Sequence, residues 1–267
     1  MVFVRIATWN INSVRLRLDL VLRALDEIDP DILFLQETKV PDHLFPEDRF
    51  RERGYTHIAR AGMKGYNGVA ILSRLPLDDI RRHDWCGQSD ARHIAARTTD
   101  DIDIHCVYIP SGGDTPDPDT NPKFAHKLQF VDDMTAWWPD IIGADSRAVL
   151  LGDLNIAPLE NDVWSHKQML NVVSHTPAEV ERLTAMAGSV GWVDAVRHFV
   201  PSDKRLYSWW SYRARDWATS NRGRRLDHIW VTPALANGLK DTGILTQARG
   251  WPPKPSDHVP VWVDLTP

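Results

Sequence analysis

One pattern recurs along this chain and limits what it can fold into: a short apolar run that stops at an acid or an amide. The clearest example covers residues 149–155, where an apolar run and Gly152 are followed by Asp153, Leu154 and Asn155. Such a run, bounded by glycine, is typical of a strand in a sheet interior. Because successive strand side chains point to opposite faces, Asp153 and Asn155 lie on the same side. Asp and Asn also form turns, so this stretch taken alone leaves a turn open.

The same ending recurs at other predicted strands. The polar residues at these ends are Asn10 and Asn12, Glu37, Tyr108, Asp153 and Asn155, Asp227, and the group Ser256, Asp257 and His258 just before the last strand. One such end would most often be a cap or a turn, whereas turn chemistry hardly explains a whole set. Loops at the C-terminal edge of a sheet are where α/β enzymes place their sites. We therefore expect these side chains to gather in one site.

Helix-like and strand-like periodicities alternate along the chain. Helices are predicted at residues 16–28, 45–53, 123–142 and 177–187. Strands are predicted at residues 2–11, 32–35, 55–61, 69–72, 94–98, 102–109, 149–155, 207–210, 225–232, 244–248 and 259–265, and residues 192–199 fit either type. Hairpins among these strands argue against a simple parallel repeat. We predict one α/β domain over residues 1–267, with two mixed sheets packed face to face and helices outside.

Composition excludes several classes of protein. No apolar run approaches the roughly 18 to 20 residues of a membrane span, and the N-terminus lacks a signal-peptide layout. Two cysteines, Cys86 and Cys106, are too few for a disulfide framework, which favours a reducing cytoplasm. The net charge of −5 weighs against a protein that simply coats nucleic acid. A nucleic-acid enzyme with a local basic patch remains compatible with it.

The residue types at the strand ends indicate a metal site. Oxygen ligands without cysteine suit a hard cation such as Mg²⁺ or Mn²⁺. Mg²⁺ typically takes one or two carboxylates and keeps several waters, so Glu37 with Asn10 or Asn12 nearby would suffice.

The remaining polar residues indicate hydrolysis of a phosphodiester. Asp227 could orient His258 and stabilise its charged form, so that the pair acts as a base or binds a phosphate oxygen. Asp153 is the better candidate to orient or deprotonate a water, while Asn155 and Tyr108 donate hydrogen bonds to a phosphate oxygen. A serine hydrolase is disfavoured, because the chain has no GxSxG elbow and Ser256 lies two residues from His258.

Five segments make the chain recognisable. They are WNINSVR from Trp9, LQETK from Leu35, GDLNIAP from Gly152, NRGRRLD from Asn221 and SDHVP from Ser256. In this order they resemble the exonuclease III family of apurinic/apyrimidinic endonucleases, within the wider endonuclease/exonuclease/phosphatase superfamily. The likeness spans residues 6–264. The GDxN and SDHxP elements indicate only the superfamily, whereas the other three are more specific to its DNA-repair branch.

The resemblance implies a four-layer α/β sandwich and a Mg²⁺-dependent monomer that cuts duplex DNA 5′ to an abasic site and trims blocked 3′ ends. It also implies roles for the matching positions. Glu37 would be the principal metal ligand, with Asn12 and Asp257 on the metal side; Tyr108 and Asn155 would contact the scissile phosphate, supported by Asn10; Asp153 would position the water; and Asp227 with His258 would stabilise the phosphate. Relatives usually carry Asn or Gln where this chain has Ser111, which puts a direct phosphate contact by Ser111 in question.

Residues 207–225 interleave aromatic residues with arginines, which suits phosphates and unstacked sugars or bases. Trp209 and Trp210 cannot face the same way in a strand, and we predict that Trp209 meets substrate while Trp210 packs inside. The other substrate contacts that we predict are Arg213, Arg222, Arg224 and, in a glycine-rich loop, Asn67. Lys64, Lys123 and Lys127 are further candidates for contacts to the DNA backbone.

By resemblance, Trp209 and Leu226 would line the pocket for a flipped abasic sugar, where Arg224 stands in place of an apolar or aromatic residue. A phosphatase or phosphodiesterase acting on a small or lipid ester is the main alternative, and the arginine–tryptophan segment disfavours it. A non-enzymatic DNA-binding relative would be expected to lose Glu37, Asp153 or His258, and all three are present.

Overall fold

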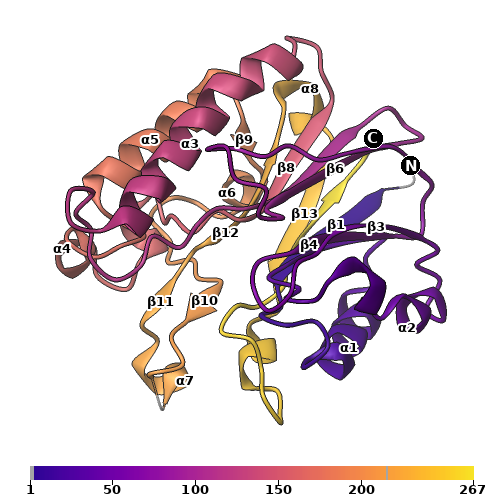
Figure 1. Ribbon diagram of the computed structural model, residues 1–267, viewed down its shortest axis with the longest axis horizontal. Coiled ribbons are helices and arrows are strands. Elements are labelled where there is room, and N and C mark those ends of the chain that lie inside the picture. Colours follow the sequence, from indigo (N-terminus) through magenta and orange to yellow (C-terminus); the bar gives the residue numbers. More distant parts are fainter. Residues whose placement is uncertain (1–2, 215) are drawn as a thin grey trace.

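Two six-stranded mixed sheets pack against each other with helices on their outer faces (Figure 1). The structure is a computed structural model that describes residues 3–214 and 216–267. The first sheet has the order β13-β14-β1-β2-β4-β3 and the second the order β5-β6-β7-β8-β12-β9. The predicted α/β class, with two mixed sheets face to face, is confirmed.

The elements have the following bounds. The first sheet consists of β1 (Val4–Asn10), β2 (Ile32–Gln36), β3 (His57–Ala61), β4 (Val69–Ser73), β13 (Leu239–Ile244) and β14 (Val261–Leu265). The second consists of β5 (Leu77–Arg81), β6 (His93–Thr98), β7 (Asp103–Tyr108), β8 (Ala148–Asp153), β9 (Val193–Asp194) and β12 (Asp227–Val231). A separate ribbon pairs β10 (Trp209–Trp210) with β11 (Gly223–Arg224). The helices are α1 (Leu18–Ile28), α2 (Glu47–Arg51), α3 (Pro122–Ile141), α4 (His166–Met169), α5 (Pro177–Ser189), α6 (Ala195–Phe199), α7 (Trp217–Ser220) and α8 (Pro233–Ala236), with 3₁₀ turns at Asp42–Leu44, Glu160–Asp162 and Thr246–Gly250.

The central strands β2 and β8 are apolar up to their polar last residues because both of their faces are buried. Phe34 of β2 and Leu151 of β8 belong to the core between the two sheets. Leu33, one residue earlier in β2, packs with α1, and Leu150 of β8 packs with Trp138 of α3. Alternate side chains of one strand therefore pack into two different cores, and the fold has four layers.

The strand directions bring the polar strand ends to one edge. β1 runs parallel to β2, and β7 runs parallel to β8 with Tyr108 opposite Asp153. β12 is antiparallel to β8 and begins at the same edge, with Asp227 opposite Asp153. Within the first sheet, the Ser256 hydroxyl donates to the Asn10 carbonyl at 2.7 Å, which ties the segment before β14 to the end of β1.

Gly152, just before Asp153, is required by this packing. It has φ +136°, and a Cβ built on it would lie 2.0 Å from the Val107 carbonyl oxygen of β7. No side chain fits there without moving the neighbouring strand.

The sequence-based boundaries were wrong in several places. Strand β5 was not predicted, because its exposed polar residues lack an apolar run. Residues 244–248 were predicted as a strand, whereas β13 ends at Ile244 and a 3₁₀ turn follows; β13 is an edge strand whose polar residues face solvent. The ambiguous residues 192–199 contain both types, with β9 leading directly into α6. In the described residues, no helix combines the length and the apolar character needed to cross a membrane.

Candidate active site

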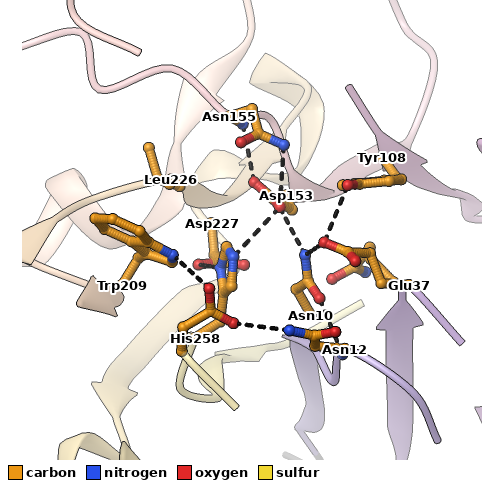
Figure 2. Close-up of polar contacts among 12 residues, drawn as sticks. Asn10, Asn12, Glu37, Tyr108, Asp153, Asn155, Trp209, Leu226, Asp227 and His258 are labelled. Carbon is orange, nitrogen blue, oxygen red and sulfur yellow. Dashed lines mark hydrogen bonds and ion pairs between the residues drawn. The ribbon is translucent and has the colours of Figure 1, made fainter. Parts of the chain in front are cut away.

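The polar strand ends meet around one cavity of about 230 Å³ (Figure 2). Of the predicted site residues, its lining includes Glu37, Tyr108, Ser111, Asp153, Asn155, Trp209, Arg224, Leu226, Asp257 and His258. Gly113, Val173 and Ser174 complete the lining. The expectation that separate strand ends gather in one place is therefore met.

Glu37 forms one side of the cavity. Its Oε1 accepts hydrogen bonds from Asn10 Nδ2 at 2.8 Å and from Tyr108 Oη at 3.0 Å. Its Oε2 lies 2.7 Å from Lys39 Nζ. Burial alone would raise the pKa of Glu37, but the Lys39 ammonium, the Asn10 donor and the charge of His258 lower it below its usual value. Glu37 is therefore ionised at neutral pH.

The Lys39 ammonium group lies between two of the predicted metal ligands. Lys39 Nζ lies 2.7 Å from Glu37 Oε2 and donates to Asn12 Oδ1, also at 2.7 Å. Two hard oxygen donors thus converge on one positive charge, and this donor set fits Mg²⁺ or Mn²⁺. Lys39 was not predicted as a site residue, although it lies in the LQETK segment.

Asp257 and Asn10 complete this side in different ways. Asp257 Oδ1 accepts a hydrogen bond from Asn12 Nδ2 at 3.3 Å, and its Oδ2 accepts one from Trp209 Nε1 at 3.0 Å. Burial would raise its pKa, but the nearby His258 and these donors lower it. The Asn10 oxygen instead accepts the backbone N–H of Asn12, so Asn10 bridges other residues and does not present a free oxygen.

Asp227 and His258 form a buried pair. His258 Nδ1 lies 2.8 Å from Asp227 Oδ2, which also accepts the Ser208 hydroxyl at 2.6 Å. Burial lowers the pKa of His258, but the charges of Asp227 and Asp153 outweigh burial and raise it. The ring is therefore an imidazolium with Nδ1 engaged, which leaves Nε2 to interact in the cavity.

Asp153 lies on the other side of this imidazolium. Its Oδ2 is 3.6 Å from His258 Nε2 and accepts hydrogen bonds from Asn10 Nδ2 at 2.8 Å and from Asn155 Nδ2 at 3.2 Å. Burial raises the pKa of Asp153 above its usual value, although His258 opposes this. Because Asn10 donates to both Glu37 and Asp153, one amide couples the two carboxylates.

A second arrangement in the cavity could also hold a metal. One ligand atom each from Asp153, Asp227 and His258 lie within 4.8 Å of one another. His258 would have to lose the proton on Nε2 to serve as a ligand there, while Nδ1 could keep its hydrogen bond to Asp227. The oxygen donors of Glu37 and Asn12 need no such rearrangement beyond moving Lys39.

Tyr108 and Asn155 bring donor groups to the cavity, and in this structure these groups are bonded to Glu37 and Asp153. Burial raises the pKa of Tyr108 well above its usual value, so its hydroxyl keeps its proton, and the Arg92 guanidinium lies 4.8 Å from the ring centre. Asn155 has φ +53°, and its amide also donates to the Ile109 carbonyl at 2.9 Å. Ser111 lies at the rim of the cavity, and its side chain is exposed.

The aromatic segment divides as predicted. Trp209 is half-buried and lines the cavity, whereas Trp210 is only 2% exposed and packs in the core against α7 and Tyr207. Leu226 lines the same wall from behind Trp209. The Arg224 guanidinium stacks on the Trp209 ring at 4.9 Å.

Arg213 and Arg222 line a neighbouring groove of about 710 Å³ that shares Trp209 and Arg224 with the cavity. Arg222 stacks on Trp164 at 4.5 Å. Trp164 was missed, because a single tryptophan in an irregular segment carries no periodic signal.

One of the sequence-based contacts is corrected by the structure. The Asn67 amide donates to the Asp90 carbonyl at 2.8 Å, and Asn67 does not line the cavity, so its contact to substrate stays a prediction. Lys127 was a candidate for contacts to DNA, but its side chain is fully buried. Lys127 Nζ pairs with Glu179 at 2.5 Å and donates to the Asn155 carbonyl at 2.8 Å. It therefore supports the site from inside the protein.

The fold and this cavity define the class of protein. The model of the Endonuclease/Exonuclease/phosphatase family matches residues 7–258, and the chain belongs to this family. It is 30% identical to exodeoxyribonuclease III of Haemophilus influenzae over 97% of this chain and 98% of that protein. An AP endonuclease structure from Archaeoglobus fulgidus matches it with a TM-score of 0.91 and 33% identity over 99% of this chain and 100% of the other. A 3′ phosphatase, NExo, from Neisseria, bound to a product DNA hairpin, matches it with a TM-score of 0.90 and 31% identity over 98% and 99% of the two chains.

Proposed function

We propose that this protein is a metal-dependent DNA repair nuclease that cleaves the backbone of duplex DNA 5′ to abasic sites and removes blocking groups from 3′ ends. The observation that carries the proposal is the single cavity in which Asn10 links Glu37 to Asp153 while His258 faces Asp153. Its relatives include exodeoxyribonucleases and a DNA repair nuclease, and similar structures include AP endonucleases.

The chain supplies a donor or a base for each part of the hydrolysis. The His258 imidazolium stabilises the negative charge that builds up on the phosphate oxygens. The Tyr108 hydroxyl and the Asn155 amide do the same once a phosphate oxygen replaces Glu37 and Asp153 as their acceptors. Asp153, whose pKa is raised by burial, takes a proton from the attacking water. Asp227 keeps His258 charged and oriented through the bond to Nδ1.

Glu37 and Asn12, with Asp257 beside them, would hold the metal, and Mg²⁺ or Mn²⁺ is the ion that fits these oxygen donors. Such an ion, when bound, supplies positive charge to the scissile phosphate and its leaving oxygen. Lys39 occupies this position in the structure, so we expect its ammonium to move aside when a cation binds.

The surface beside the cavity suits DNA. Arg213, Arg222 and Arg224 concentrate positive charge around Trp209 and Trp164 in a protein whose net charge is −5. This arrangement combines phosphate contacts with aromatic platforms for an extrahelical sugar or base. We propose that the enzyme acts as a monomer, and that its two unpaired cysteines reflect a reducing, cytoplasmic location.

The test is cleavage of a duplex that carries one tetrahydrofuran abasic analogue, with Mg²⁺ and with EDTA, beside an undamaged duplex. We expect incision at the analogue only with the metal, and a loss of at least about 100-fold in rate for the isosteric Asp153→Asn variant. Hydrolysis of a small phosphate ester without any incision of the duplex would move the protein to the phosphatase branch.

The same assay locates the metal. Glu37→Gln keeps the shape of the side chain but removes its charge, so we expect a higher Mg²⁺ concentration at half-maximal rate. If Glu37→Gln leaves that concentration unchanged, the ion binds elsewhere, and the group formed by Asp153, Asp227 and His258 becomes the alternative.

A further inference from the structure

A buried hydroxyl lies directly behind the pair of Asp227 and His258. The Asp227 carboxylate accepts two hydrogen bonds from the described residues, and both go to Oδ2: one from His258 Nδ1 at 2.8 Å and one from the Ser208 hydroxyl at 2.6 Å. Its other oxygen, Oδ1, is buried and has no hydrogen-bond partner in the described part of the chain. The orientation of the carboxylate therefore depends on two donors, of which only Ser208 lies outside the pair.

The surroundings of Ser208 determine where its hydroxyl proton points. Ser208 is fully buried, and its Oγ accepts the backbone N–H groups of Leu226 and Asp227, both at 3.1 Å. A hydroxyl offers one proton and two acceptor sites, and here both acceptor sites are occupied. The proton is therefore directed to Asp227 Oδ2, and a hydrogen bond to a charged acceptor is stronger than one between neutral groups.

The backbone of Ser208 is fixed as well. Its N–H donates to the Arg224 carbonyl at 2.9 Å, and its carbonyl accepts the Val259 N–H at 2.8 Å. The next residue, Trp209, lines the cavity and forms an isolated β-bridge with His258. Ser208 therefore joins the ribbon that carries the aromatic wall of the cavity to the segment that carries the imidazole.

We propose that Ser208 is a positioning residue for the phosphodiester hydrolysis: its hydroxyl holds the Asp227 carboxylate in the orientation that aims the His258 ring into the cavity. This inference rests on the proposed function and adds a third member to the pair. The position requires a group that accepts two N–H bonds and donates one, which serine and threonine provide and alanine does not. In Ser208→Ala the carboxylate would keep only the bond from His258, so the two side chains would be free to rotate together.

The first measurement is incision of the tetrahydrofuran duplex in Mg²⁺ by wild type and by variants at position 208. We expect Ser208→Ala to lower kcat by about 10-fold or more, the size of one hydrogen bond to a charged group, and to leave KM nearly unchanged. The effect falls on kcat because His258 acts on the transition state. Ser208→Thr keeps the hydroxyl and should retain most of the activity. Ser208→Cys fills the same space with a weak donor, so it should lower kcat even if Ser208→Ala does not fold.

The ring proton of His258 gives a second readout, which needs neither metal nor turnover. An Nδ1 proton held by a buried carboxylate exchanges slowly with water and gives a far-downfield NMR signal, which is identified by its absence in His258→Gln. We expect this signal in EDTA for wild type and Ser208→Thr. In Ser208→Ala it should be lost through exchange, and in Ser208→Cys it should be weakened.

Ser73→Ala is the matched control. Ser73 is also fully buried, and its hydroxyl bonds to the Leu75 backbone at the end of β4 that pairs with the start of β2, away from the polar strand ends. This variant loses a buried hydroxyl as Ser208→Ala does, but it should keep both the wild-type kcat and the His258 signal. Thermal unfolding of each variant shows whether the protein is folded.

The outcomes separate the two levels of the argument. If wild type incises the duplex but folded Ser208→Ala or Ser208→Cys keeps the wild-type kcat and an unchanged His258 signal, the positioning role is wrong and the proposed function stands. The role is equally refuted if Ser73→Ala loses as much activity as Ser208→Ala, or if folded Ser208→Thr is no more active than Ser208→Ala. If wild type cleaves neither this duplex nor one with a blocked 3′ end, the proposed function itself fails.

Discussion

The ion pair between Lys127 and Glu179 should be the most sensitive part of the scaffold behind the active site. Both side chains are fully buried, and Lys127 Nζ donates to Glu179, to the Asn155 carbonyl and to the Ser111 carbonyl. Burying two charged groups costs free energy, and their mutual attraction offsets this cost only while both groups are present. Lys127→Met, which nearly preserves the volume of the side chain, would leave the Glu179 carboxylate without its cation.

The expected loss follows from what Glu179 keeps. Removing one partner of a buried pair typically costs about 3–5 kcal/mol. Glu179 still accepts hydrogen bonds from the Ser174 and Thr176 backbone N–H groups and from the Thr176 hydroxyl, so we expect the lower end, about 3 kcal/mol. The free energy of unfolding of a domain is only about 5–15 kcal/mol, so this loss is large.

Urea unfolding followed by tryptophan fluorescence measures the effect. Lys123→Met is the matched control, because Lys123 is exposed on the same helix, and its loss should stay below about 0.5 kcal/mol. The double variant Lys127→Met/Glu179→Gln should recover part of the stability, since no charge then remains buried in the pair. Its nuclease activity should stay below that of wild type, because the Asn155 and Ser111 carbonyls have lost their donor.

Two results would refute the reasoning. One is a loss below about 1 kcal/mol for Lys127→Met, which would mean that Glu179 is neutral or solvated without its partner. The other is additivity, in which the double variant loses as much as the two single variants together, because a coupled pair cannot behave in this way.

Three further predictions concern other parts of the molecule. His258→Gln should lower kcat by at least about 100-fold with a smaller change in KM, since it removes an imidazolium that acts on the transition state; a change confined to KM would contradict this role. Gly152→Ala should lower the free energy of unfolding by at least about 3 kcal/mol, because its Cβ would overlap the Val107 carbonyl, and unchanged thermal unfolding would refute the clash. Burial lowers the pKa of His105 to about 3. Below pH 6.5 the unfolded chain therefore binds a proton that the folded protein does not. As the pH falls further, this group lowers the free energy of unfolding by about 1.4 kcal/mol per pH unit. His105→Asn should flatten the fall in unfolding free energy between pH 6 and 4 by about 1 kcal/mol per unit, as measured by urea unfolding at each pH, and an unchanged slope would show that His105 is protonated in the folded protein.

Local patterns were sufficient to predict those parts of the fold that depend on neighbours along the chain. The run that ends at Asp153 and Asn155 identified β8, because a strand buried on both faces must be apolar throughout. Alternation in a strand separated Trp209 from Trp210 before any contact was known. β5 escaped prediction because an exposed edge strand needs no apolar run.

The membership of the site was predictable, but its hydrogen bonds were not. Polar strand ends indicated that Glu37, Asp153 and His258 would meet, and a resemblance supplied their roles. Asn10 bridges two carboxylates, and Lys39 lies between Glu37 and Asn12. Both arrangements depend on the directions of side chains at the ends of β1 and β2. Neither direction is encoded in residue spacing alone.

By itself, then, the sequence determined the class of fold, the edge of the sheets that carries the site, and the residue types available for chemistry there. Only the tertiary structure decided that Lys127 is an internal support, because its partner lies 52 residues away on another helix. It also decided that Arg224 is anchored by Val173 and Ser174, which approach it from a segment about 50 residues earlier, and that it has no counter-ion in the described part of the chain. The physical reason is the same in both cases: the state of a charged side chain depends on which distant groups the fold brings within a few ångströms of it.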